Sequence, residues 1–256
     1  MSSNLKTRLD EKVQNLKIAP AETAVQSTEL AEVESGYVAL TTNAINVIKE
    51  NLKNQPLSYQ LFDIVKSPSG GITVFSVPSL NGEEIHKELT GVILDYSTPR
   101  AFWETRDPVE GTPPSCYSRD SFTSTEGKPC FSCPYNTFGS KDGDSNAKAC
   151  KESVQLLLLR PESIMPIIVR IPVSSKNSFL KYMGRLIGNM VPLCGIVTRI
   201  SLEKATSKGG KPYAQFNFEA VTLLRPDETV SARTYGQQFA ELVNAANNME
   251  TTAKAV

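Results

Sequence analysis

The stretch GIVTRISLEKATSKGGKPYAQFNFEAVTLL, residues 195–224, decides the fold. Residues 194–202 and 212–224 are rich in β-branched and aromatic side chains, and a basic, glycine-rich turn at 204–211 separates them. Two such runs joined by a glycine-containing turn are typical of a β-hairpin. We therefore predict two long antiparallel strands here.

Side chains of the second hairpin strand alternate between two faces of the predicted sheet. Phe216 and Phe218 share one face, which we assign to the core, and Tyr213 lies on the other. Base stacking on an aromatic ring, with nearby cations for phosphate, is typical of single-strand binding. The alternative is that Tyr213 only covers a sheet edge. The candidate nucleic-acid contacts of the hairpin are Arg199, Lys208, Lys211 and Tyr213.

Shorter runs of strand character precede the hairpin, and a helical pattern lies directly before it. The apolar side chains of residues 174–187 recur at helical spacing, and shorter helices are predicted near 41–52 and at 237–246. The stripe expected on the first of these helices consists of Phe179, Leu180, Met183, Leu186 and Ile187. The chain is therefore mainly β with α, an α+β protein. The predicted strands before the hairpin are 72–77, 89–96, 100–104, 154–159 and 164–171.

Four cysteines lie in a segment that has almost no aliphatic side chains. Cys130 and Cys133 form a CxxC pair; thirteen residues separate it from Cys116 before it, and sixteen separate it from Cys150 after it. Four thiolates complete the tetrahedral sphere of a structural zinc, and zinc binding can supply folding free energy to a segment without a core. We expect one structural Zn²⁺ on Cys116, Cys130, Cys133 and Cys150; the alternatives are a redox CxxC and unrelated thiols. The fifth cysteine, Cys194, is predicted to be a buried thiol.

Composition divides the chain into five segments around these cysteines. They are an N-terminal arm and helix (1–60), first barrel strands (61–106), a zinc-binding insertion (107–150), the remaining barrel strands with helix and basic hairpin (151–230), and a C-terminal helix with polar tail (231–256).

The formal net charge of zero conceals a basic second half. Residues 151–233 carry 12 Lys and Arg against 6 Asp and Glu. A basic region is compatible with a polyanionic partner, although a solvated surface is the simpler reading. A second candidate contact cluster is Arg100 with Trp103, and Lys181 is a third candidate; the alternatives are a core tryptophan and a solvated helix face.

Sequence motifs of common enzyme classes do not occur. The only histidine, His86, lies in a polar stretch and is predicted to be a surface residue, and Asp142 and Asp144 resemble turn residues. We expect no enzymatic activity. The opening residues MSSNLKTRLDEKVQ lack the apolar centre of a secretory signal, and no stretch is apolar enough to span a membrane, so a cytoplasmic location is expected.

Two of these stretches resemble a known family. The hairpin at 195–224 resembles the last hairpin of phage single-stranded DNA-binding proteins, and the block CxxCPYNTFGS, ending in ACK, resembles a cysteine-rich module of phage proteins associated with DNA replication. The resemblance covers about residues 65–225. It implies a five-stranded Greek-key barrel of the oligonucleotide-binding (OB) type, cooperative coating of single strands, and a zinc insertion in the barrel.

The resemblance and the order of predicted elements lead to one expected function. We expect a single-stranded DNA-binding protein of phage replication or recombination, with other proteins of those processes as further partners. The sequence departs from the family at its end, METTAKAV, which is not the acidic tail that recruits such partners. The alternative is a zinc-stabilised adaptor or inhibitor of a host protein. The oligomeric state is left open.

Overall fold

The computed structural model describes residues 36–41, 44–53, 55, 57–105, 112–141, 146–207 and 209–253. For residues 241–253 only the backbone is described. All of these residues belong to one compact unit, Ala31–Val256. The predicted N-terminal arm, Lys208, Asp142 and Asp144 lie outside the described residues.

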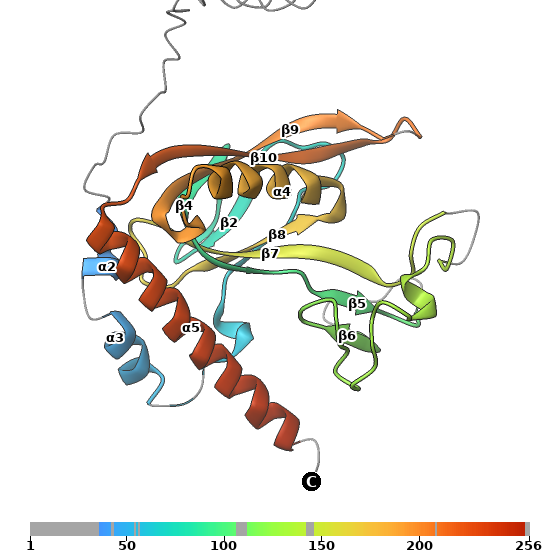
Figure 1. Cartoon of the computed structure of the whole chain (residues 1–256), viewed down its shortest axis with the longest axis horizontal. Coiled ribbons are helices and arrows are strands. Elements are labelled where there is room, and N and C mark those ends of the chain that lie inside the picture. The colour runs from blue at the N-terminus through green and yellow to red at the C-terminus, as the bar shows by residue number, and fades with distance from the viewer. Residues whose placement is uncertain are drawn as a thin grey trace, which may run out of the picture. The chain divides into compact units, whose positions relative to one another are not determined.

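The central feature is a curled sheet whose main path has the order β1-β8-β7-β4-β9-β10 (Figure 1). Neighbours on this path are antiparallel, except that β1 is parallel to β8. The prediction of a mainly β chain with helices is therefore confirmed. The strand bounds are β1 Ile64–Val65, β4 Glu88–Ser97, β7 Lys151–Leu159, β8 Ile167–Pro172, β9 Ile196–Thr206 and β10 Pro212–Leu223.

Strand β4 gives the sheet its curl, because its two halves pair with different neighbours. Its first half, from Glu88 to Val92, pairs with β9, and its second half, from Val92 to Ser97, pairs with β7. An irregularity between Ile93 and Asp95 bends the strand further. A Cβ at Gly91 would lie 2.4 Å from the carbonyl oxygen of Leu159, so only glycine fits this approach of two strands.

The hairpin predicted from residues 195–224 is formed by β9 and β10. Its turn is closed by the backbone N–H of Ser207, which donates to the carbonyl of Lys211 at 2.9 Å, and Gly210 supplies the positive φ of 76°. Phe216 is fully buried and Phe218 partly buried, as predicted, while Tyr213 is partly buried on the other face.

Two hydrophobic cores lie on opposite faces of the sheet. Leu156 and Leu158 of β7 enter the core inside the curl, whereas Leu157 and Leu159 contact the core on the outside. This alternation explains why β7 reads as a continuous apolar run. The outer core is covered by helices α2 (Val38–Thr41), α3 (Ala44–Asn51) and α5 (Pro226–Ala253).

Helix α4, Val173–Gly188, covers the free edge of β10. The backbone N–H of Phe216 donates to the Ser175 hydroxyl at 3.1 Å, and this serine is fully buried. The predicted helix at 174–187 is therefore correct in position, but the predicted apolar stripe is partly wrong. Leu180 and Ile187 are 45% and 69% exposed, because the helix buries the face that carries Ser175 and Phe179.

Two local predictions were wrong. Residues 82–86, which were not predicted to form a strand, form β3 (Gly82–His86) and pair with β2 (Phe75–Ser79) in a separate two-stranded sheet, so the polar stretch with His86 is a strand. Helix α5 begins at Pro226, eleven residues earlier than predicted, because proline suits the first helical position and Glu228 accepts from the Arg225 backbone N–H.

No helix in the described ranges is long and apolar enough to cross a membrane.

Candidate metal centre and nucleic-acid interface

The four predicted cysteines lie in a module that leaves the sheet after β4 and returns to it at β7. We call residues 98–150 the cysteine module. Its framework is β5 (Arg100–Phe102), which pairs with β6 (Cys116–Ser118) and with the start of β7. The module lies beyond the ends of β4 and β7 (Figure 1).

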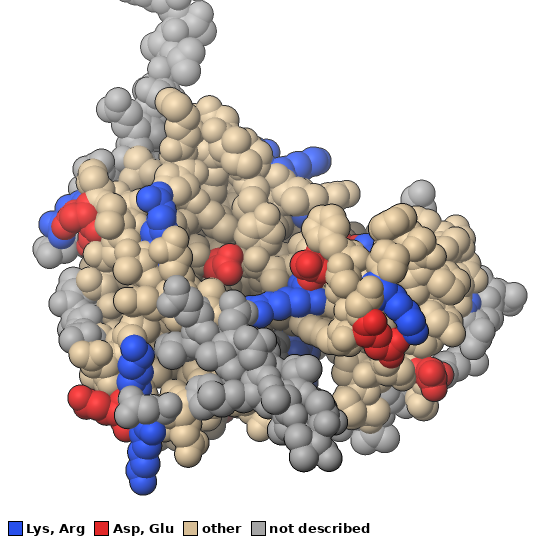
Figure 2. Space-filling view, turned by 60° about the horizontal axis from the view of Figure 1, so that its bottom comes forward, with Lys and Arg blue, Asp and Glu red and all other residues tan. Residues whose placement is uncertain are grey.

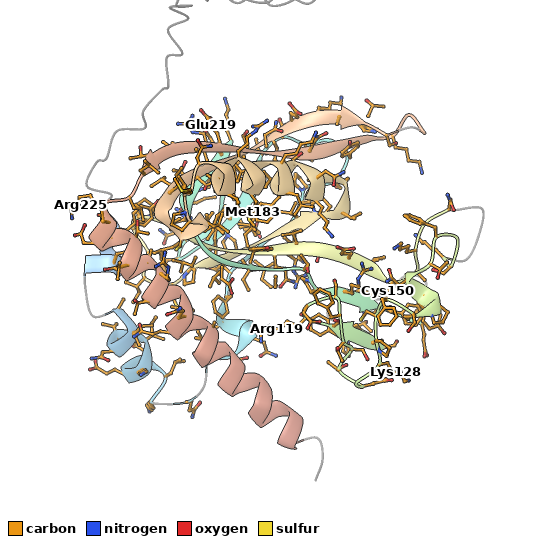
Figure 3. The ribbon with its side chains drawn as sticks, in the orientation of Figure 1. Arg119, Lys128, Cys150, Met183, Glu219 and Arg225 are labelled. Carbon is orange, nitrogen blue, oxygen red and sulfur yellow. The ribbon has the colours of Figure 1, made fainter. Side chains whose placement is uncertain are left out.

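Backbone hydrogen bonds set the positions of these four cysteines. Cys116 is paired with Phe102 across β5 and β6, and the Cys133 N–H donates to the Cys130 carbonyl at 3.4 Å within the CxxC turn. The Cys150 N–H donates to a carbonyl of the segment that follows this turn, at 2.9 Å. All four cysteines line one cavity of about 370 Å³. The structure thus brings together residues that are up to 34 positions apart. Figure 3 shows Cys150 where the module meets β7.

The four thiols are suitable zinc ligands by their chemistry, but their positions in the structure do not match a zinc site. No group of three or more His, Cys, Asp or Glu among the described residues is placed so that it could hold a metal ion as it stands. Zinc requires its sulfur ligands about 2.3 Å away in tetrahedral arrangement. The shared cavity and the all-thiol donor set meet the chemical requirement, whereas the coordination distances are not met.

The electrostatics of the cavity disfavour thiolates in the absence of a cation. Burial raises the pKa of the Cys116 thiol, and the negative charges of Glu126 and of neighbouring cysteines raise it further. Burial likewise raises the pKa of Cys150, which the Arg100 guanidinium partly opposes. Ionising more than one of these thiols would place like charges around the same cavity. A bound divalent cation would reverse this repulsion.

A hydrogen-bonded network ties the CxxC turn to the sheet and to α4. Asn136 donates to the Cys130 carbonyl at 2.8 Å and accepts from Arg100 at 2.6 Å. Arg100 also donates to Glu152 at 2.6 Å, and Lys176 of α4 binds the same carboxylate. The Arg100 side chain is 12% exposed. The structure therefore places this predicted nucleic-acid contact inside a network that joins the module to the sheet.

The other predicted nucleic-acid contacts lie on three separate elements. Trp103 belongs to the module, where its indole N–H donates to the Thr112 carbonyl at 2.9 Å. Lys181 is exposed on α4, and Arg199 binds both Glu88 and Glu219 across neighbouring strands. Lys211 and Tyr213 lie at the tip of the hairpin, and Lys208 lies outside the described residues.

Exposed aromatic rings of the module were missed by the sequence reasoning. Phe131, inside the CxxC turn, is 85% exposed, and Phe122 and Phe138 are 75% and 71% exposed. Lys148 lies over the Phe138 ring, with its Nζ 4.7 Å from the ring centre. A signal was available: aromatic residues in a segment too poor in aliphatic side chains to form a core have nowhere to be buried.

The positive charges of the chain do not form one continuous stripe on the face seen in Figure 2. Lys and Arg side chains lie there singly or in small groups, with acidic side chains beside several of them. Some basic side chains of residues 151–233 are paired with acidic neighbours, as at Arg160 with Glu162 and Arg225 with Asp227.

Comparison with known proteins gives no relative. No protein-family model matches the chain, and neither the curated proteins nor the solved structures give a significant match. What the chain does must therefore be inferred from its own fold and surface.

Proposed function

We propose that this chain is a non-enzymatic, sequence-independent single-stranded DNA-binding protein of phage replication or recombination, built on an OB barrel with a structural zinc. The observation that carries the proposal is the strand order. If β4, β7, β8, β9 and β10 are numbered as barrel strands one to five, the order across the sheet is 3-2-1-4-5. A helix, α4, lies between the third and fourth of them. Greek-key barrels of the OB type share this arrangement.

The loops of this arrangement support the same function. OB barrels bind oligonucleotides with the loop between strands one and two and the loop between strands four and five. The first of these loops is here the cysteine module, with its exposed rings. The second is the hairpin turn, flanked by the exposed side chains of Lys204 and Lys211. Both candidate groups of contacts therefore lie where an OB barrel places its ligand.

The barrel is proposed to close through a helix rather than through strand pairing. In the described residues, β8 and β10 are the sheet edges that a complete barrel would join, and they are not paired with each other. Helix α4 instead binds the β10 edge, through Ser175 and through Ser178, whose hydroxyl accepts from Gln215 at 3.3 Å. A covered edge is protected from pairing with another chain.

Zinc is proposed to stabilise the module and to take no part in binding chemistry. We assign Cys116, Cys130, Cys133 and Cys150 as its four ligands, a set that leaves no open coordination position for catalysis. Their cavity lies in a segment whose largest apolar side chains are mostly exposed. Such a segment lacks a core of its own, and a metal supplies the missing folding free energy.

Fluorescence anisotropy with labelled oligo-dT tests the proposal. Binding at low salt is expected, with affinity falling as salt rises and with weaker binding to a duplex of equal length. The absence of any anisotropy change at micromolar protein and low salt would falsify single-strand binding.

A zinc-stabilised adaptor is the second candidate function, and one observation favours it. Val173, Leu180 and Ile187, spaced by seven residues along α4, are 60%, 45% and 69% exposed. Residues at this spacing share one helix face, and an exposed apolar face is typical of protein contacts. Replacing Leu180 and Ile187 by Ser should abolish binding of a host protein while oligo-dT binding is unchanged, if the chain is an adaptor.

A further inference from the structure

The exposed rings of the cysteine module are unusual within this chain. The chain has ten phenylalanines, and all ten lie in the described residues. Only three are exposed, Phe122, Phe131 and Phe138, and they fall within seventeen residues of one another. Single exposed apolar side chains need no explanation, but three large rings in one short segment indicate an interaction surface.

The CxxC turn positions the backbone of two of these aromatic residues. Phe131 lies between Cys130 and Cys133, and the Phe122 carbonyl accepts from the Cys130 N–H at 2.8 Å. Next to them, the ring of Tyr135 stacks on Phe102 with centroids 4.0 Å apart. A ring on a backbone fixed in this way loses little conformational entropy when a ligand stacks on it.

Lysines lie beside the aromatic rings, and the acidic side chains of this region are engaged locally. Lys148 Nζ is 4.7 Å from the centre of the Phe138 ring, and Lys151 Nζ is 5.7 Å from that of Trp103. Asp120 accepts from the backbone N–H groups of Phe122 and Thr123, at 2.8 and 3.1 Å. Glu126 is paired with Lys128 at 2.6 Å. Lys148 and Lys151 thus place positive charge beside Phe138 and Trp103, while the hydrogen-bonded Asp120 keeps its negative charge beside Phe122.

We infer that the module binds single-stranded DNA through an aromatic surface made of Phe122, Phe131 and Phe138 with Lys148 and, at the adjoining start of β7, Lys151. Unpaired bases stack on the rings, and the lysines contact phosphates. This inference rests on the proposed function and adds to it the surface that performs it. Rings interleaved with cations fit a single strand, since bases offer π-faces and phosphates offer negative charge. Protein interfaces are instead depleted in lysine.

The test compares a triple variant, Phe122→Ala, Phe131→Ala and Phe138→Ala, with the wild type by anisotropy. The probes are labelled oligo-dT and an abasic oligomer of equal length, which has phosphates but no bases. We expect the triple variant to lose roughly 1,000-fold in oligo-dT affinity, since each of the three base stacks contributes about tenfold, and to bind the abasic oligomer as the wild type does. The matched control is Ile85→Ala, an exposed apolar residue of β3 with 66% exposure.

Intrinsic fluorescence supplies a local readout, because Trp103 is the only tryptophan and belongs to the same module. Quenching on addition of oligo-dT is expected in the wild type and the control, and it should be lost in the triple variant. Zinc content and the circular dichroism spectrum verify that the variant is folded. If it is misfolded, the single variant Phe131→Ala takes its place, with an expected loss of about tenfold.

The outcomes separate this inference from the proposed function. Wild-type oligo-dT affinity in a folded triple variant overturns the aromatic surface and leaves single-strand binding in place. An equal loss of affinity for oligo-dT and for the abasic oligomer also overturns it, because stacking cannot act on an oligomer without bases. If the wild type binds neither oligomer, the proposed function fails, and the aromatic surface fails with it.

Discussion

The guanidinium of Arg100 donates from Nη2 to the Glu152 carboxylate at 2.6 Å. This bond joins β5 of the cysteine module to β7 of the sheet. The two side chains are only 12% and 13% exposed, and Lys176 of α4 binds the second carboxylate oxygen. One carboxylate thus links the module, the sheet and the helix. This arrangement gives the first prediction.

Glu152→Ala should destabilise the protein more than Arg100→Ala. Glu152→Ala leaves the Arg100 and Lys176 side chains without their shared carboxylate and should cost about 3 kcal/mol of stability. Arg100→Ala leaves Glu152 paired with Lys176. The free energy of unfolding in urea measures both. Glu126→Ala, which removes an exposed pair with Lys128, is the control and should leave stability unchanged. Equal effects of Glu152→Ala and Arg100→Ala would contradict the shared role of this carboxylate.

Removal of the metal ligands should release about one zinc per chain. We expect the double variant Cys130→Ser, Cys133→Ser to lose this metal and to expose residues 112–150 to proteolysis, because the module has no core to replace it. Metal analysis of the purified protein and limited proteolysis check the two effects. Cys194→Ala, in the outer core, is the control and should keep its zinc. Unchanged metal content in the double variant would exclude the proposed centre.

The hydrogen bond between Ser175 and β10 should contribute more to stability than the hydrogen bond of the neighbouring Ser178. Ser175→Ala leaves the buried N–H of Phe216 without its acceptor and should cost about 1–3 kcal/mol. Ser178→Ala removes a bond to the partly buried Gln215 and should cost less. Urea denaturation of both variants measures the difference. The reverse order would show that α4 does not depend on this edge.

Two glycines should respond to alanine with opposite signs. At Gly91 a Cβ would lie 2.4 Å from the Leu159 carbonyl oxygen, so Gly91→Ala forces β4 and β7 apart and lowers the melting temperature. At Gly184, in the middle of α4, no atom outside the helix lies within 4 Å, so Gly184→Ala should stabilise by about 0.5–1 kcal/mol. Thermal unfolding followed by circular dichroism tests both. A neutral Gly91→Ala would mean that the strands do not approach so closely.

Stability should fall in alkaline solution through Tyr235. Its hydroxyl donates to the Ile164 carbonyl at 2.5 Å, and burial raises its pKa above the ordinary value. Since the folded protein holds this proton more tightly than the unfolded chain does, its contribution is complete below about pH 10 and is lost as pH rises further. Tyr235→Phe should make the decline in unfolding free energy between pH 9 and 11 shallower. An unchanged slope would assign the decline to other groups.

Prediction from sequence succeeded where a pattern is local. The hairpin, α4 and the central strands follow from period-two and helical spacing, which arise from backbone geometry within a few residues. It failed at the short β3, and at the length of α5, whose start depends on Pro226 and on a carboxylate at Glu228 that caps the preceding backbone. It also placed Leu180 and Ile187 on the buried face of α4, because amphipathic spacing does not say which of two adjacent stripes meets the sheet.

The same contrast holds at the candidate site. Cys116, Cys130, Cys133 and Cys150 were grouped by spacing alone, and the structure places them around one cavity. By contrast, nothing in the local sequence around Arg100 predicts that it would bind Glu152, since the two are 52 residues apart and meet only when β5 pairs with β7.

By itself, the sequence determined the hairpin at residues 195–224, the segment without a core and the four thiols within it, because each depends on composition and on spacing along the chain. Only the tertiary structure decided the strand order, the edge that α4 covers, and which aromatic rings remain in solvent. Those features depend on pairings between residues far apart in sequence, and such pairings are selected by the burial of the whole sheet rather than by any one segment.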